Sequence, residues 1–179
     1  MTDFTLYYNF QPNDERYTPR YAVLPILKYL PDKIVWCPFD TENSEFVLAL
    51  KENGFKVVFS HLRNGQNFFE YEPEEWDLIV SNPPFTKKRE VFERCLSFGK
   101  PFALLMSNLW LNDSSPSKLF KERELQLLLF DKRVQYDSIN KRVPFGSSYF
   151  CWNILPKQIV FEPLNYVKNQ YSRMYLDFE

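Results

Sequence analysis

Residues 74–96 have the sequence EEWDLIVSNPPFTKKREVFERCL, and the five residues at its centre, 81–85, match neither of the segments beside them. Residues 76–81 form an apolar run that is typical of a buried β-strand. Residues 89–99 have apolar side chains at helical spacing and end at Gly99, which predicts an α-helix. The unusual residues therefore lie at the carboxyl end of a predicted strand, where the chain turns into a helix.

Strands and helices alternate through the first two thirds of the chain. The apolar patterns predict helices at residues 18–30, 44–54 and 89–99, and strands at residues 33–37, 55–60, 76–81 and 101–107. Thr18 and Ser44 are placed to cap the first two helices, and Pro25 is expected to bend the first one. The strands are almost continuously apolar, as in a parallel sheet that helices cover on both faces.

Three later segments, residues 125–130, 133–139 and 147–155, are rich in aromatic side chains and have no strong helix between them. They predict a terminal antiparallel hairpin on the parallel sheet. We therefore expect an α/β fold, a three-layer sandwich with one mostly parallel sheet between helices, as a single domain over residues 1–179. Residues 1–17 are interpreted as an N-terminal arm and residues 165–179 as a C-terminal tail.

The composition narrows the classes of partner. The chain of 179 residues has a net charge of -1, so any basic surface that attracts phosphate must be local. It has 4 glycines, whereas most phosphate-binding loops depend on glycine. The 3 cysteines and 1 histidine form no ligand pattern, so we expect neither a disulfide framework nor a metal site. We see no signal peptide and no apolar run of membrane length, which predicts a cytoplasmic protein without membrane contact.

The residues at the strand end have a chemistry of their own. Pro83 and Pro84 stiffen the backbone and have no N–H donor, while the Asn82 side chain has a carbonyl acceptor and an amide donor. Phe85 adds an apolar face. Together they predict a small rigid pocket in which a planar amine donates to the Asn82 and Pro83 oxygens and stacks on Phe85. The alternative interpretation is an ordinary tight turn between a strand and a helix.

The stretch from Ser81 to Phe85 resembles the (D/N/S)-P-P-(Y/F/W) motif of S-adenosylmethionine-dependent methyltransferases that act on planar nitrogen atoms. The resemblance is closest to the adenine-specific DNA methyltransferases, especially small phage and prophage forms, and runs from about Tyr17 to Leu164. It implies the class I methyltransferase fold, a Rossmann-like and mainly parallel seven-stranded sheet whose last strand is antiparallel. It also implies S-adenosylmethionine as the methyl donor and DNA as the partner.

The resemblance places the cofactor against the first half of the sheet. A helix start near Thr18 would lie close to the methionine carboxylate. Residues 36–40 occupy the place of the glycine-rich or Asp-Pro-Phe loop of the family, without its leading acid and without its glycines. In this loop Pro38 and Phe39 would pack on the cofactor, and Asp40 would accept a hydrogen bond from its amino group.

The resemblance implies four further cofactor residues. Ser60 or His61 would bind the ribose hydroxyls, although His61 is equally well interpreted as a polar residue at the edge of the sheet. Asn67 would accept from the adenine amine, and Phe68 would lie against the adenine ring. The alternative for the aromatic pair Phe68 and Phe69 is core packing, and we expect one of the two rings to belong to the core.

Two segments are expected to contact the target. Lys87, Lys88 and Arg89 form the densest basic run, which beside a base pocket would hold DNA phosphate, although such runs are usually solvated helix starts. Phe145 or Tyr149, in a segment that resembles the target-pocket motif of the family, would stack on the target base. The catalytic sheet uses the whole chain, so we expect loose sequence specificity, a homodimer or a partner protein for target recognition.

The leading hypothesis is transfer of a methyl group from S-adenosylmethionine to the exocyclic amino group of adenine in DNA. The same motif also serves RNA and the glutamine amides of proteins, and the near-neutral charge mildly favours a small or proteinaceous substrate. A third hypothesis is a non-catalytic binding module with the methyltransferase fold, because the expected glycines and acids of the cofactor loops are replaced.

Overall fold

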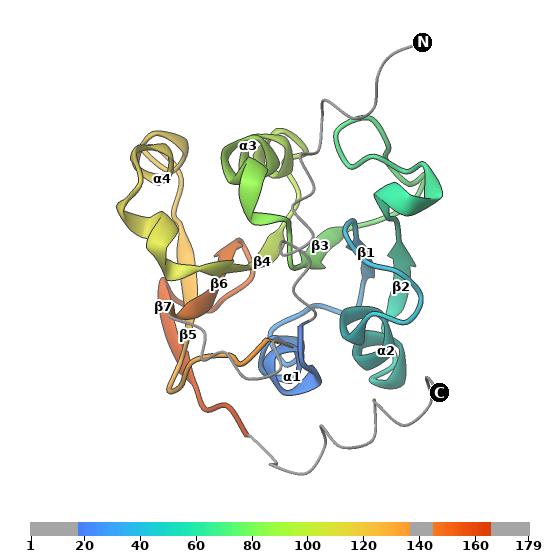
Figure 1. Cartoon of the computed structure of the whole chain (residues 1–179), viewed down its shortest axis with the longest axis horizontal. Helices are drawn as coiled ribbons and strands as arrows, with labels where there is room; N and C mark the ends of the chain where they lie inside the picture. Colours follow the sequence, from blue (N-terminus) through green and yellow to red (C-terminus); the bar gives the residue numbers. More distant parts are fainter. Residues whose placement is uncertain (1–17, 137–144, 166–179) are drawn as a thin grey trace.

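The computed structural model describes residues 18–136 and 145–165, apart from the side chain of Phe85. The expected arm at residues 1–17 lies outside the described residues, as does the expected tail beyond residue 165. Within the described part, seven strands form one sheet in the order β2-β1-β3-β4-β6-β5-β7 (Figure 1). The strands are β1 (Ile34–Cys37), β2 (Lys56–Phe59), β3 (Leu78–Ser81), β4 (Phe102–Ser107), β5 (Gln126–Phe130), β6 (Ser147–Trp152) and β7 (Ile159–Glu162).

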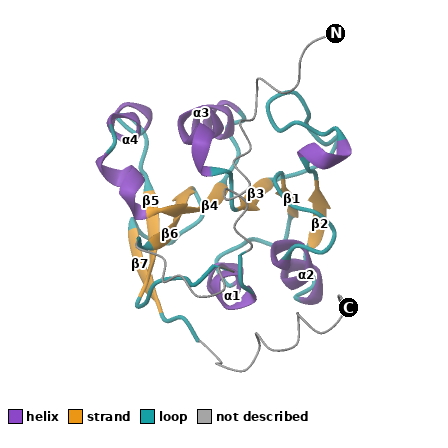
Figure 2. Cartoon of the chain, in the orientation of Figure 1, coloured by secondary structure: helices purple, strands orange, loops and turns teal. Residues whose placement is uncertain are grey.

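Helices cover both faces of this sheet. α1 and α2 lie on one face, and α3 and α4 lie on the other (Figure 2). The elements are α1 (Arg20–Leu27), α2 (Glu45–Glu52), α3 (Lys88–Ser97) and α4 (Ser114–Leu119), with the 3-10 helices η2 (Leu62–Asn64), η3 (Phe85–Lys87) and η4 (Asn108–Asn112). The expected three-layer α/β sandwich is therefore confirmed.

Most neighbouring strands run parallel. β1 is parallel to β2 and β3, β3 to β4, and β5 to β7, whereas β6 is antiparallel to both β4 and β5. The mostly parallel sheet and the antiparallel pair β5–β6 late in the chain agree with the prediction. One detail differs, because the reversed strand is not the last one. β7, which the sequence does not predict, follows β6 and again runs parallel beside β5.

The central strands are buried on both faces, which explains why they have no polar face. In β3, Leu78 and Val80 pack into the core beneath α1 and α2, whereas Ile79 packs into a second core beneath α3. In β4, Ala103 and Leu105 face the first core in the same way. The second core contains most of the buried aromatic rings. Apolar burial on both faces is what stabilises a parallel sheet of this kind.

Ser44 is the residue before α2, as predicted, whereas Thr18 is not the residue before α1. Pro19, not Thr18, is the residue at the start of α1, and the Thr18 hydroxyl contacts another part of the chain. Ser44 does precede α2, but its Oγ accepts from the backbone N–H of Thr41 (2.9 Å) rather than from the helix. Pro25 lies inside α1, as predicted.

The predicted strand at residues 133–139 is wrong for its described part, because residues 133–136 contain no strand. Val134 and Tyr136 are buried and Gln135 is half-buried, so the alternation behind the prediction is real. The backbone of Gln135, however, pairs with a side chain. Its N–H donates to Tyr21 Oη (2.9 Å), and the same hydroxyl donates to its carbonyl oxygen (3.2 Å). A tyrosine of α1 takes the place of a neighbouring strand.

Three further features complete the fold. The sequence does not predict α4, because its residues SSPSKL are mainly polar and only Pro116 is buried. Cys37, Cys95 and Cys151 are buried and free, without a disulfide. Among the helices of the described ranges, none combines the length and the apolar character needed to cross a membrane.

Candidate active site

The carboxyl ends of β1, β2 and β3 lie side by side at one edge of the sheet, where open parallel sheets bind ligands. Asp40 follows β1, Ser60 follows β2, and Ser81 ends β3. The N–H of Asp40 donates to the carbonyl oxygen of Ser60 (3.2 Å), and the N–H of Ser60 donates to that of Cys37 (3.1 Å). The structure thus brings these three strand ends together at one edge of the sheet.

Asp40 is buried at this edge, with 7% of its surface exposed. Its Oδ2 accepts a hydrogen bond from Ser81 Oγ (2.5 Å), which joins the end of β1 to the end of β3. Burial raises the pKa of Asp40 from 3.8 to about 6, while hydrogen bonds from Ser81 and Ser44 act in the opposite direction. Asp40 is therefore mostly ionised at neutral pH, but it titrates in mild acid.

Asn82 follows Ser81 directly, and a residue from the start of the described chain holds its amide. Asn82 Nδ2 donates to Thr18 Oγ1 (3.0 Å), one residue before the Pro19 cap of α1. Because the amide group is planar, the bond at Nδ2 directs the amide oxygen, Oδ1, away from Thr18. Thr18, which the resemblance assigns to the cofactor, therefore contacts the target motif. The structure places Asn82 at the carboxyl end of a buried strand, and its role as an acceptor stays a prediction.

The two prolines separate Asn82 from a short helical turn. Pro83 is buried and Pro84 is half-buried with extended backbone angles (φ -60°, ψ 140°). Phe85 then begins η3, which leads directly into α3. The side chain of Phe85 lies outside the described part of the structure, so its stacking on a target base stays a prediction.

Three polar residues predicted to bind the cofactor accept hydrogen bonds inside the protein. Ser60 is fully buried, and its Oγ accepts from Trp36 Nε1 (3.0 Å). His61 Nδ1 and Asn67 Oδ1 each accept from the backbone N–H two residues further along the chain, at 3.1 Å and 3.2 Å. These bonds fix the connection between β2 and β3, and a cofactor would have to share or replace them.

Phe68 lies in the core rather than beside a ligand. It is 1% exposed, and its ring centroid is 5.5 Å from that of Trp36 and 4.8 Å from that of Phe39. The expected contact of Phe68 with the cofactor adenine does not fit this position. The alternative, in which one ring of the pair belongs to the core, is the arrangement that the structure has. Phe39 is half-buried on the same core, and Pro38 is buried.

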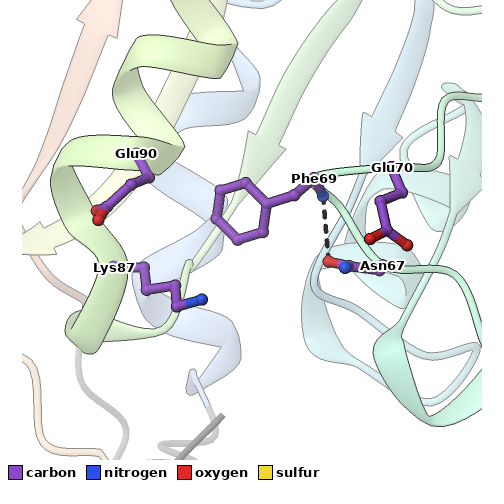
Figure 3. Close-up of a pocket in the computed structure, with 5 residues that line it drawn as sticks. All are labelled: Asn67, Phe69, Glu70, Lys87 and Glu90. Atoms are coloured by element: carbon purple, nitrogen blue, oxygen red, sulfur yellow. Dashed lines mark hydrogen bonds between the residues drawn. The ribbon is translucent and has the colours of Figure 1, made fainter. Parts of the chain in front are cut away.

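The neighbouring ring, Phe69, faces a pocket of about 250 Å³. Figure 3 shows this ring extending from the connection between β2 and β3 toward Lys87 and Glu90. Lys87 Nζ lies 5.5 Å from the centroid of the ring. Pockets for whole drug-sized ligands have volumes of roughly 300–1,000 Å³, so this pocket suits a smaller group such as a single base. Its lining residues are Asn67, Phe69, Glu70, Lys87 and Glu90.

The basic run, residues 87–89, does not form one cationic patch. Lys88 Nζ lies 4.0 Å from Asp113 Oδ2, whereas Arg89 Nε lies 2.7 Å from Glu93 Oε1 on the exposed face of α3. Successive side chains of a helix point about 100° apart, so a basic run at a helix start spreads its charges. The predicted phosphate contacts stay predictions, but these side chains lie on different surfaces.

Tyr149 lies in the core beneath α1. It is fully buried, its Oη donates to the carbonyl oxygen of Ala22 (2.9 Å), and its ring packs against Phe46 and Phe130. Burial raises the pKa of this phenol well above its ordinary value. The expected stacking of Tyr149 on a target base does not fit this position. Phe145 is half-buried just before β6 and packs against the same core, and its role stays a prediction.

The sequence misses four residues of this region: Ser81 as the partner of Asp40, and Phe69, Glu70 and Glu90 as pocket residues. Glu90 comes three residues after Lys87, and this spacing predicts that the two side chains lie on the same side of a helix. Nothing local signals the bond between Ser81 and Asp40, which are 41 positions apart.

No protein-family model matches the sequence, and no curated protein matches it. The structure is similar to a predicted O-methyltransferase from Agrobacterium tumefaciens, at 9% identity and a TM-score of 0.47, covering 80% of this chain and 85% of that one. It is also similar to a candidate class I S-adenosylmethionine-dependent methyltransferase from Listeria monocytogenes, at 11% identity and a TM-score of 0.43, covering 92% of this chain and 70% of that one. Scores of this size carry no functional argument, so function is argued from the residues of the site.

Proposed function

We propose that the chain transfers a methyl group from S-adenosylmethionine to the exocyclic amino group of adenine in DNA. The observation that carries the proposal is the position of Asn82. It follows a fully buried parallel strand, Thr18 holds its amide, and two prolines stiffen the backbone after it. A planar amine beside Asn82 would meet an acceptor that is already oriented, which lowers the cost of reaching the transition state.

The chemical difficulty of this reaction is the amine, whose lone pair is delocalised into the purine ring. In the proposed mechanism its two hydrogens point at Asn82 Oδ1 and at the carbonyl oxygen of Pro83, which draws electron density back to nitrogen. When bound, S-adenosylmethionine supplies a methyl group on a positively charged sulfur. In such a transfer the amine nitrogen would form a bond to this methyl carbon, the carbon–sulfur bond would break with its electron pair on sulfur, and one N–H proton would leave to solvent.

In this proposal, the pocket beside Phe69 binds the adenine base of the cofactor. A flat ring packed on Phe69 would have the Asn67 amide in the lining of the same pocket. An amide oxygen accepts hydrogen bonds from an adenine amine, so Asn67 fits that group. We assign Asn67 and Phe69, rather than Phe68, to this part of the site.

Methyl transfer by the purified protein tests the proposal. With labelled S-adenosylmethionine, the wild type should label adenine in DNA, and Asn82→Ala should reduce the rate by about 10²–10³ because it removes an acceptor used in the transition state. Asn53→Ala is the matched control, because Asn53 also makes one side-chain hydrogen bond, to Ala49 O (2.8 Å), at the end of α2. Transfer that survives Asn82→Ala unaltered would contradict the proposal.

A second candidate function is non-catalytic ligand binding. It is favoured by the hydrogen bonds that Ser60, His61 and Asn67 already accept inside the protein. Calorimetry with S-adenosylmethionine separates the two functions, since heat of binding and a thermal shift support the enzyme, and their absence at millimolar ligand supports the other function. Assays with DNA, RNA and glutamine-containing protein, run side by side, then identify the acceptor.

A further inference from the structure

Backbone pairing ends one residue before the proposed catalytic amide. The last pair between β3 and β4 is Ser81 with Leu104, and Asn82 lies beyond it. Pro83 and Pro84 have no N–H with which to extend the ladder. The position of Asn82 therefore depends on side-chain contacts of the residues at the strand end.

Two such contacts come from different elements. On one side, Asn82 Nδ2 donates to Thr18 Oγ1 (3.0 Å). On the other side, Asp40 Oδ2 accepts from Oγ of Ser81, which is fully buried. Ser81 and Asn82 share one planar peptide group, so a rotation or shift of Ser81 is passed on to Asn82. Asp40 is thereby linked to the proposed acceptor without touching it.

We propose that Asp40 is a positioning residue, which holds Ser81 and through it sets the place of Asn82 and of the target amine. The inference rests on the proposed function for its catalytic meaning, and it replaces the expectation that Asp40 binds the amino group of the cofactor. One carboxylate oxygen already accepts from Ser81, and with 7% exposure little surface remains for a second, charged partner. A buried carboxylate needs such a donor, because burying it without a hydrogen bond is costly.

Four variants separate positioning from cofactor binding. If Asp40 positions Asn82, Asp40→Ala and Ser81→Ala each lower kcat by about 10–100-fold, because a small misplacement of a reacting group has effects of that size. The double variant loses no more than either single one, since both remove the same bond. Asp40→Asn keeps an oxygen acceptor in the same place and restores kcat to within about 3-fold of the wild type. The calorimetric affinity for S-adenosylmethionine stays unchanged in all four.

A cofactor-binding role predicts the opposite pattern and would overturn the inference. In that case Asp40→Ala and Asp40→Asn both weaken S-adenosylmethionine binding by about tenfold or more, because the charge is lost, while Ser81→Ala does not. Asp77→Ala is the matched control. Asp77 Oδ2 also accepts one hydrogen bond, from the backbone N–H of Ile34 (2.9 Å), but at the amino end of β1, so kcat should remain at the wild-type value.

Nuclear magnetic resonance of the Asn82 side-chain amide tests the link without turnover. We expect its two N–H resonances to move in Ser81→Ala and Asp40→Ala and to return in Asp40→Asn. Unchanged resonances in Ser81→Ala would overturn the inference even if the wild type is an active enzyme. If the variants shift these resonances but the wild type transfers no methyl group, the proposed function is overturned. The inference that Asp40 positions Asn82 is then still supported. Ser81→Ala removes only a hydroxyl, so it decides the question should Asp40→Ala fail to fold.

Discussion

In this protein, one group of residues is far apart in the sequence but close in the structure, and another is contiguous in the sequence but separated in its contacts. The strand-end cluster, Thr18, Asp40, Ser81 and Asn82, is spread over the sequence at separations of 41 and 64 positions, yet hydrogen bonds join its members. The basic run, residues 87–89, is contiguous, yet its side chains contact three different partners. Parallel strands gather distant residues at one edge, whereas a helix turns each successive side chain by about 100°.

The difference shows which side chains this fold holds in fixed positions. In the cluster, Asp40 and Ser81 are buried and Thr18 and Asn82 are half-buried. Its hydrogen bonds connect the ends of β1 and β3 and the start of α1, so each bond restrains two parts of the fold at once. The basic run lies on η3 and the first turn of α3, where Arg89 pairs with a residue of its own helix. Changes in the cluster should therefore affect the geometry of the site, and changes in the run should remain local.

The largest effect is expected at Phe68 and Phe69. These residues are adjacent in the sequence, but Phe68 lies in the core and Phe69 lies at the pocket. Phe68→Ala should lower the free energy of unfolding by about 3–5 kcal/mol, because it empties a position in the aromatic core. Phe69→Ala should cost only about 1–2 kcal/mol, since this ring is half-buried at the pocket. Urea denaturation of the two variants measures both values.

Ligand affinity should show the reverse order. Phe69→Ala should weaken the calorimetric binding of S-adenosylmethionine, because it removes the flat face of the pocket. For Phe68→Ala the comparison is made at a temperature at which the variant remains folded. Equal losses of stability from the two substitutions would mean that both rings belong to the core, and the assignment of Phe69 to the pocket would be wrong.

The fold is predictable from the sequence where a single residue pattern has a single cause. Apolar runs at residues 76–81 and 101–107 predict β3 and β4, because strands covered on both faces need apolar side chains throughout. The pattern fails at residues 133–136, where alternating burial arises without a strand partner. There the hydroxyl of Tyr21 bonds to the Gln135 backbone, and no local pattern reports a bond over 114 positions.

The candidate site is predictable only to the level of strand ends. The sequence places Asp40, Ser60 and Asn82 at one edge, because each follows an apolar strand. It does not predict which side chains pair there. The family resemblance assigns Asp40 and Thr18 to the cofactor, whereas the structure joins them to Ser81 and Asn82. Such pairings depend on side-chain direction at the end of a strand, which residue type and spacing do not specify.

An intermediate effect is expected from the titration of Asp40. Because its pKa is raised, Asp40 binds a proton more tightly in the folded protein than in the unfolded chain. The resulting loss of stability is fully present above about pH 6 and disappears as the pH falls toward 3.8, so stability from this group rises in mild acid. A rise from 3.8 to about 6 corresponds to about 3 kcal/mol.

Urea denaturation of the wild type and Asp40→Asn at pH 7 and pH 4.5 measures this effect. Relative to the variant, which cannot titrate at this position, the wild type should be more stable at the lower pH than at the higher one. Asp77→Asn shows what the loss of a carboxylate does at the amino end of β1. If the difference in free energy of unfolding between wild type and Asp40→Asn is the same at both pH values, the carboxylate of Asp40 is well solvated. The strand-end cluster would then contain no buried charge.

The smallest effect is expected at the outer end of the basic run. Arg89 pairs with Glu93 on the exposed face of α3, and Arg89→Ala should leave the melting temperature unchanged because exposed ion pairs contribute little. One phosphate contact changes the slope of log affinity against log salt by about 0.9, so DNA binding by Arg89→Ala should keep nearly the wild-type slope. Lys87→Ala, at the pocket, should reduce it. Equal reductions in the two variants would show that residues 87–89 hold DNA as one unit, and the contrast with the strand-end cluster would no longer stand.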